Sequence, residues 1–192
     1  MPPASEGAPA RRRDAEENRA RIVAAAREVF ATAGFAAPLD AIARRAGVGR
    51  ATLYRNFPDR FALGAAIFEA NLVALEALAR ELRGRADAFM TLLAAIVEQQ
   101  IEGHALVPAL LRGPGVRDLQ ALALRVMRLL AAPLRRARTA GAIRRDLTPA
   151  DVLASLAMIS AVVADDASVA SRRRRATRAL DLLIHGLAPR GE

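Results

Sequence analysis

The residues that could do chemistry in this sequence are arginines, and they gather in one short stretch. Between Arg44 and Arg60 the chain carries five arginines against a single aspartate. A guanidinium group is a planar fork of N–H donors that pairs with phosphate oxygens or with the edge of a guanine base. The whole chain contains no lysine, and its formal net charge is +9. The stretch therefore predicts binding of a polyanion such as nucleic acid, although a bias toward arginine codons is an alternative explanation of the composition.

Residue types that serve enzymatic or metal chemistry are scarce. The sequence has no cysteine and only two histidines, His104 and His185, so thiolate ligands and cysteine nucleophiles are excluded. No Ser-His-Asp arrangement, glycine-rich phosphate loop, metal-ligand spacing or isolated carboxylate pair stands out. We therefore expect a protein that is not an enzyme and that uses no cofactor and no metal ion.

Two short helices joined by a glycine turn must position the arginines. Leu39–Ala46 has apolar residues at helical spacing, the turn is residues 47–49, and Arg50–Phe57 is a second short helix with a polar outer side. A longer helix is expected before them, from Asp14 to Gly34. This arrangement predicts a helix-turn-helix, in which the second helix enters the major groove of DNA.

The rest of the chain also predicts helices, and no strand pattern appears. A helix from Arg60 to about Arg83 is apolar on nearly all sides, so we expect it to bridge the N-terminal unit and the remaining body. Further helices are expected near residues 86–102, 104–111, 116–140, 149–165 and 171–187. The predicted fold is all-α with about nine helices: a disordered basic tail over residues 1–13, a three-helix DNA-binding helix-turn-helix domain over 14–58 and a C-terminal helical domain over 59–192.

Membrane and export signals are not evident. No apolar run approaches the roughly 20 residues that span a bilayer. Residues 1–10 lack both the basic start and the apolar centre of a signal peptide. We therefore expect a cytoplasmic protein with no membrane partner.

The helix-turn-helix stretch carries a long ordered pattern. Ile42-Ala43 is followed by Ala46-Gly47-Val48-Gly49 and then by the run Thr52-Leu53-Tyr54-Arg55-Asn56-Phe57-Pro58-Asp59-Arg60. With its flanking helices, over roughly Ile22 to Phe68, this pattern closely resembles the DNA-binding signature of the TetR family of bacterial transcriptional regulators. The resemblance implies a homodimer that binds double-stranded operator DNA, in most members as a repressor.

The resemblance also implies which side chains touch the DNA. The predicted DNA-binding residues are Arg50, Ala51, Thr52, Tyr54, Arg55, Asn56 and Arg60. Thr52, Tyr54 and Arg60 match phosphate contacts, which fix the register of the protein on the duplex. Arg50, Ala51 and Arg55 match positions that face base edges or nearby phosphates, and Asn56 stands where the family more often has histidine. For Tyr54 the alternative is a ring packed against the first helix.

By the same resemblance, residues 59–192 form an effector-binding and dimerisation domain. The family encloses a small-molecule effector between the helices that follow the fourth. The predicted pocket residues are mostly apolar, and the alternative is that they are ordinary core residues; they are Phe89, Leu93, Ile96, Val97, Gln100, His104, Met127, Leu130 and Met158.

The last two helices are expected to pair with their copies across a twofold axis. The alternative is that their contact faces pack within their own domain. The predicted contact faces are Leu153, Leu156, Ala157, Ser160, Val163 and Ala164 on the first of the two helices and Ala176, Ala179, Leu180, Leu183 and Leu187 on the second. Effector and DNA would favour different arrangements of the dimer, transmitted by the helix that begins at Arg60, so that each weakens binding of the other. The competing hypothesis is a dimeric DNA-binding factor, architectural or partner-controlled, without an effector; a solid core in place of a cavity would favour it.

Overall fold

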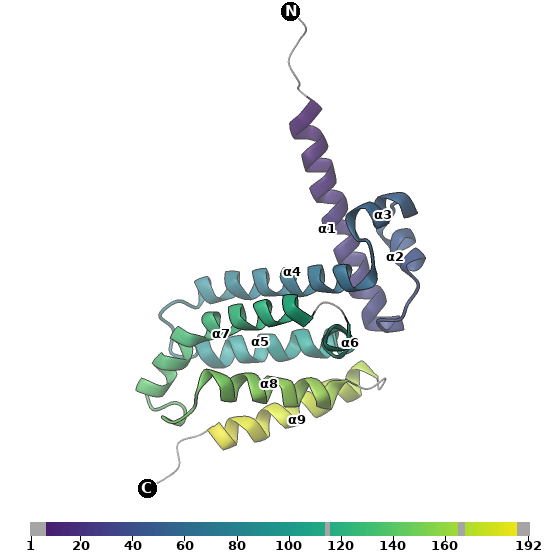
Figure 1. The fold of residues 1–192 in the computed structure, drawn as a ribbon. Helices are drawn as coiled ribbons and strands as arrows, with labels where there is room; N and C mark the ends of the chain where they lie inside the picture. The colour runs from purple at the N-terminus through teal and green to yellow at the C-terminus, as the bar shows by residue number, and fades with distance from the viewer. Residues whose placement is uncertain (1–6, 114–115, 165–167, 188–192) are drawn as a thin grey trace, which may run out of the picture.

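The computed structural model describes residues 7–113, 116–164 and 168–187, and these residues contain helices and turns but no strand (Figure 1). The N-terminal helices are α1 (Gly7–Ala33), α2 (Leu39–Ala46) and α3 (Arg50–Asn56). The helices that follow are α4 (Arg60–Glu81), α5 (Ala88–Glu102), α6 (Leu106–Arg112), α7 (Val116–Thr139), α8 (Pro149–Val163) and α9 (Val169–Leu187). The all-helical fold expected from the sequence is confirmed.

Helix α1 is longer than expected. It begins at Gly7, so the predicted boundary at residue 14 between a tail and the first domain falls inside a helix. Figure 1 shows its first half projecting beyond the other helices, while α2 and α3 lie beside its second half. The helix-turn-helix is therefore built on the C-terminal half of α1; residues 1–6 of the predicted tail lie outside the described residues.

The N-terminal helices pack around a core of their own. Ile22 and Ala26 of α1, Ile42 of α2, and Leu53 and Phe57 at α3 are all buried in it. The same core also contains two residues from α4 and two from α6, which are Leu63, Ile67, Leu106 and Leu110. A unit this small buries limited apolar surface by itself. The helices beyond residue 58 therefore complete the core of the helix-turn-helix.

Helix α4 runs between the two parts of the chain, as its apolar character predicted. It contacts α1 on one side and α5, α6 and α7 on the other.

The length and composition of α4 would also allow it to cross a membrane, contrary to the expectation that no apolar run is long enough to span a bilayer. Two carboxylates on α4 instead bind one arginine of α7: Arg125 Nη1 lies 2.6 Å from Glu69 Oε1, and Arg125 Nη2 lies 2.8 Å from Glu76 Oε1. The hydrogen bonds that Arg125 donates, mainly to Glu69 and also to Glu76, raise the pKa of Arg125.

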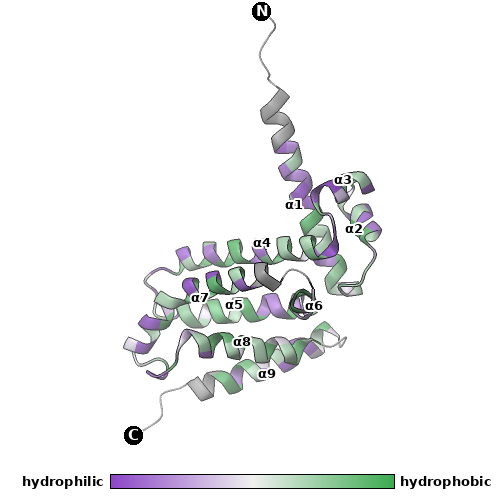
Figure 2. Cartoon of the chain, in the orientation of Figure 1, coloured by the Kyte–Doolittle hydropathy of each residue, from purple (hydrophilic) through white to green (hydrophobic). Residues whose placement is uncertain are grey.

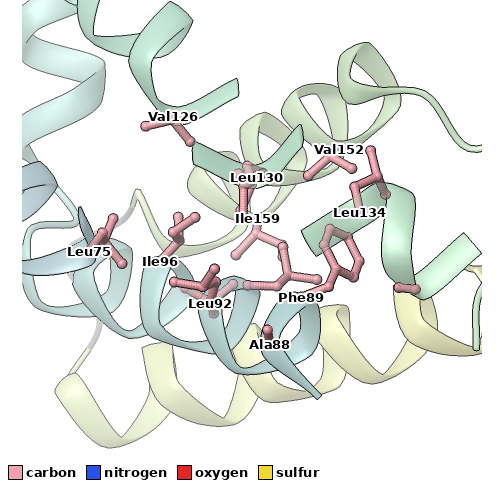
Figure 3. Packing of buried hydrophobic residues seen from close by; sticks show 14 of the residues in the cluster. Leu75, Ala88, Phe89, Leu92, Ile96, Val126, Leu130, Leu134, Val152 and Ile159 are labelled. Carbon is pink, nitrogen blue, oxygen red and sulfur yellow. The ribbon is translucent and has the colours of Figure 1, made fainter. Parts of the chain in front are cut away.

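The second core lies in the body of the protein, around α5. Figure 3 shows Phe89, Leu92 and Ile96 of α5 meeting side chains of α7 and α8, including Leu130 and Ile159. Figure 2 shows the same pattern as green, apolar faces turned toward the neighbouring helices. Helix α5 contacts α4, α7, α8 and α9, which makes it the central helix of the body.

The start of α8 carries a capping box. The Asp151 backbone N–H donates to Thr148 Oγ1 over 3.2 Å, and the Thr148 N–H donates to Asp151 Oδ2 over 2.8 Å. Two hydrogen bonds from Thr148, mainly that from its hydroxyl and also that from its backbone N–H, lower the pKa of Asp151. These reciprocal bonds satisfy donors that a helix start otherwise leaves unpaired.

Candidate functional site

The turn between α2 and α3 is held by one glycine conformation. Gly47 has φ 65°, in the left-handed region, and the Val48 N–H donates to the Ala43 carbonyl over 3.0 Å. This is the C-terminal motif in which glycine avoids the steric cost that a Cβ would impose. At the other end of α2, Pro38 is the N-cap, and no side chain caps the helix. The turn thus fixes the angle at which α3 leaves α2.

Helix α3 presents one side to solvent because its opposite side is anchored in the core. Leu53 and Phe57 are each 1% exposed. Arg50, Ala51, Tyr54 and Arg55 are exposed on the opposite side, and Thr52 and Asn56 lie at its margin, half-buried. The structure therefore brings these predicted DNA-binding residues together on one outer surface, which we call the recognition face.

Tyr54 lies on the recognition face with its side chain open to solvent. The residue is 49% exposed, so about half of its surface is open to solvent and available for contact. Nearby, Arg55 Nη2 lies 3.5 Å from Thr52 Oγ1, and Arg50 forms an ion pair with Asp40 of α2. An exposed phenol hydroxyl and guanidinium groups can all donate hydrogen bonds to DNA phosphates or bases.

Two of the predicted contact residues also make bonds within the protein. Asn56 Nδ2 donates to the Thr52 carbonyl over 2.8 Å, one turn earlier in α3. Arg60 Nη1 donates to the Phe35 carbonyl over 2.9 Å, and the residue is half-buried. Arg60 thus ties the start of α4 to the end of α1, a structural role that the sequence pattern did not indicate. Its phosphate contact stays a prediction.

Phe61, the second residue of α4, has a packing role. Its ring centroid lies 5.5 Å from that of Phe35, and Phe35 lies 5.0 Å from Phe30 of α1. The Phe61 ring also lies against Gly113 at the end of α6, where an added Cβ would be 2.1 Å from Phe61 Cε1. These aromatic rings join α1, α4 and the end of α6.

A cavity of about 330 Å³ lies in the body between α4, α5, α6, α7 and α8. Its walls are mainly leucine, isoleucine, valine and alanine side chains with Phe68. Its polar side chains are Asn71, Gln99, Gln100, Gln120 and Ser160. The volume lies in the usual range of small-molecule pockets, as does the combination of apolar walls with a few polar groups.

Only part of the predicted pocket set lines this cavity. Ile96 and Gln100 do. Phe89, Leu93, Val97 and Leu130 are instead buried in the core of the body, Met127 is half-buried away from the cavity, and Met158 is 54% exposed. His104 is buried against a different hollow, beside residues 31–34 and Arg172.

The cavity residues that the prediction missed are spread over all five helices that line the cavity, and α4 contributed none to the predicted set. Phe68, Asn71 and Leu75 come from α4, and Leu106 and Leu111 come from α6. One signal was available in the sequence: Asn71 and the Gln99-Gln100 pair are amides on helices rich in apolar residues. A polar group on such a helix must find a partner, so it marks a position where something polar is close.

The faces of the last two helices that we expected at a dimer contact are only partly buried. Leu156, Ser160, Val163 and Ala176 are buried within the chain's own body, which was the alternative interpretation, whereas Ala157 and Ala164 are exposed. Four large apolar residues of α8 and α9 are also exposed, and they are Met158, Val162, Val169 and Leu182.

The recognition face and its glycine turn define the class of this protein: it is a helix-turn-helix DNA-binding protein. Comparison with known families agrees. The family model for bacterial regulatory proteins of the tetR family matches residues 22–67, and the model for the C-terminal domain of SbtR-like transcriptional regulators matches residues 85–189. The chain therefore belongs to the TetR family, whose members are transcription regulators and not enzymes.

Solved structures of the same family resemble the whole chain. The TetR transcriptional regulator SCO0520 from Streptomyces coelicolor is 31% identical, with 90% of this chain and 99% of that one covered and a TM-score of 0.66. A TetR regulatory protein from Mycobacterium vanbaalenii is 29% identical, with 92% and 98% covered and a TM-score of 0.67. CprB from S. coelicolor A3(2), 24% identical with 91% and 90% covered and a TM-score of 0.63, shares the fold. No curated protein matches the sequence.

Proposed function

We propose that this protein is a ligand-responsive repressor: a homodimer that binds operator DNA through α3 and leaves it when a small, largely apolar effector enters the cavity. The observation that carries this proposal is that Leu106 belongs both to the cavity wall and to the core of the helix-turn-helix unit. Leu106 lines the cavity and is also 4% exposed in the core of the helix-turn-helix unit. A molecule that moves α6 therefore moves a side chain on which the DNA-binding unit is packed.

Close packing between α4 and α6 supports transmission of that movement. Gly64 of α4 lies so near α6 that an added Cβ would be 3.0 Å from Leu106 Cδ1 and 3.1 Å from Leu110 Cδ2. The same Cβ would be 3.1 Å from Phe35 Cε2, just beyond the end of α1. Tightly packed interiors shift as units and transmit displacement. Movement of α6 should therefore reorient α4 and α1 together.

The aromatic contacts provide a second link between the same elements. Phe61 lies against Gly113 at the end of α6 and packs on Phe35. The Phe35 carbonyl accepts the bond from Arg60 at the start of α4. Effector and DNA would then favour different positions of α6 and α4, and each would weaken the binding of the other.

The exposed apolar residues of α8 and α9 support dimerisation through the last two helices. Met158, Val162 and Leu182 lie on the outside of the chain although they are large and apolar, and exposed apolar surface commonly marks a protein–protein contact. Two copies would carry two recognition faces to half-sites about 34–36 Å apart or more. A regulator of this kind works where the DNA is, so we propose a cytoplasmic location.

The competing hypothesis, a DNA-binding factor without an effector, is less well supported. A body that served only for dimerisation could be filled completely, because voids cost stability. This body keeps a cavity of about 330 Å³ lined by five polar side chains.

Operator selection from a random DNA pool tests the proposed DNA binding. The purified protein should enrich a palindrome with two half-sites, and a pool without such a palindrome would contradict the proposal. On the selected operator, Tyr54→Ala should lower affinity by roughly tenfold, as expected for loss of a charge-assisted hydrogen bond. Because Tyr54 is half exposed, the melting temperature should stay close to that of the wild type, and full operator affinity would refute the assigned contact.

A further inference from the structure

We propose that the cavity selects a neutral, largely apolar molecule that carries a hydroxyl or N–H donor, and that this donor binds Gln100 Oε1. The inference rests on the proposed function in taking the cavity as the effector site. It adds the chemical class of the effector, which the family of the protein does not define. Four observations lead to it: the charge of the lining, the bonds of its amide nitrogens, the state of its amide oxygens and the volume.

The lining of the cavity carries no formal charge among the described residues that form it. Glu69 and Glu76 of α4, a helix that lines the cavity, are ion-paired with Arg125. An ion buried among apolar side chains without a partner of opposite charge pays a large desolvation cost. The occupant is therefore neutral.

The amide nitrogens on the α5 side of the cavity are already bonded. Gln99 Nε2 donates to the Asn71 carbonyl over 3.2 Å, and Gln100 Nε2 donates to the Leu156 carbonyl over 3.1 Å. Both acceptors are backbone carbonyl oxygens, which can only accept. The orientation of each side-chain amide is thereby fixed, with its nitrogen toward the neighbouring helix.

Unlike these nitrogens, two of the amide oxygens at the cavity are not hydrogen-bonded. Gln100 Oε1 and Asn71 Oδ1 are both buried, and neither has a hydrogen-bond partner in the protein. Because Gln100 Nε2 must face Leu156, Gln100 Oε1 cannot exchange places with it. Buried acceptors without partners cost free energy that a donor on a ligand would recover.

The remaining polar side chains do not change this preference. Gln120 is exposed, so water can satisfy its amide, and the Ser160 hydroxyl can rotate to donate or accept. The one acceptor in the cavity that is both unpaired and fixed in orientation, Gln100 Oε1, therefore calls for a donor. Its volume of about 330 Å³ suits a molecule of about eleven non-hydrogen atoms or slightly fewer, since one water takes about 30 Å³ in the liquid.

Pairs of isomers that differ only in the donor test the inference. We would measure dissociation constants by calorimetry for 1-octanol against 1-methoxyheptane, and for 4-butylphenol against 4-propylanisole. Each pair has one molecular formula, but only the first member donates a hydrogen bond. The wild-type protein should bind the alcohol and the phenol roughly tenfold more tightly than their ethers, because an ether leaves Gln100 Oε1 desolvated and unpaired. Octanoate at neutral pH should bind more weakly than 1-octanol.

Two variants assign the preference to one atom. Gln100→Leu removes the acceptor, so the ratio between alcohol and ether should fall severalfold while the affinity for the ether is kept. Gln99→Leu removes an amide from the same wall whose oxygen is not among the unpaired buried atoms, so the ratio should stay close to the wild-type value. The isomer comparison on the wild-type protein remains decisive if either variant fails to fold.

The possible outcomes separate this inference from the proposed function. Equal binding of both isomers, tighter binding of octanoate, or no binding of any of these probes would overturn the inference. A preference for donors that persists in Gln100→Leu would also overturn the assignment to Gln100. If instead the donors are selected but no donor-bearing probe changes operator affinity, the inference stands and the proposed effector response fails.

Discussion

Three leucines on α6 lie in different surroundings: one in the cavity wall, one in the core of the helix-turn-helix unit and one in both. Replacing each of them with alanine should separate the two roles of this helix. Leu106 lines the cavity and belongs to the core of the helix-turn-helix unit. Leu110 belongs to that core, at 2% exposed, but does not line the cavity. Leu111 lines the cavity and is 56% exposed. The three variants are thus chemically identical changes within one short helix.

The expected loss of stability follows from burial. Leu→Ala removes three carbon groups worth about 0.8 kcal/mol each when buried, and the space left behind raises the cost further. We expect Leu106→Ala and Leu110→Ala each to lower the free energy of unfolding by about 3 kcal/mol. For a chain of this length that corresponds to a fall in melting temperature of about 6–12 °C. Leu111→Ala should cost about 1 kcal/mol or less, because more than half of this residue is already in water.

Thermal melts and calorimetric titration with 1-octanol together read out the two roles. Leu110→Ala should lower the melting temperature and leave octanol binding unchanged, Leu111→Ala should do the reverse, and Leu106→Ala should change both. If Leu110→Ala melted like the wild type, α6 would not stabilise the helix-turn-helix unit. If Leu106→Ala left octanol binding unchanged, Leu106 would not connect the two environments, and the observation behind the proposed function would be lost.

Three further predictions concern the turn, the arginines and acid stability. Gly47→Ala should destabilise the protein by about 1–2 kcal/mol in chemical denaturation, because alanine is strained at φ 65°; Gly49→Ala, at φ −70° in open space, is the control and should change little. Arg60→Ala should lower the melting temperature, while Arg55→Ala should leave it unchanged and relax base preference in operator selection; the reverse pattern would contradict the bonds described. The lowered pKa of Asp151 gives stability that is present above its unfolded pKa near 3.8 and is lost as the pH falls below it. Asp151→Asn should therefore flatten the acid limb of a stability–pH curve, and an unchanged limb would refute this contribution.

The parts of the fold that depend on local sequence could be predicted from it. Gly47 ends α2 because the chain needs a left-handed residue there, and the Thr148 capping box begins α8 through bonds within four residues. The recognition face follows in the same way, because Leu53 and Phe57 lie one turn apart and fix which side of α3 is outward. These features need no knowledge of distant contacts.

Features that depend on how helices pack could not be predicted from single-helix patterns. On α5, Ile96 and Val97 are neighbours in sequence and both belong to the core of the body, but only Ile96 also lines the cavity. Likewise the Arg60 guanidinium reaches a carbonyl 25 residues earlier in the chain, a partner that no local motif encodes. The pattern of a single helix also does not show whether its apolar face packs on its own chain or on a second copy. The apolar faces of α8 and α9 predict a dimer contact, but both helices also pack on α5.

The sharing of α6 between two cores has a consequence for how proteins of this architecture can be divided. A fragment ending at residue 58 would lack Leu63, Ile67, Leu106 and Leu110, four residues that close the core around α1, α2 and α3. A helix-turn-helix unit that is moved into another protein is therefore not one contiguous segment. It includes α6, a short helix that lies nearly fifty residues further along the chain. Hybrid regulators assembled by joining one DNA-reading segment to another protein's sensor should work only when α6 is taken from the same parent as α1 to α4.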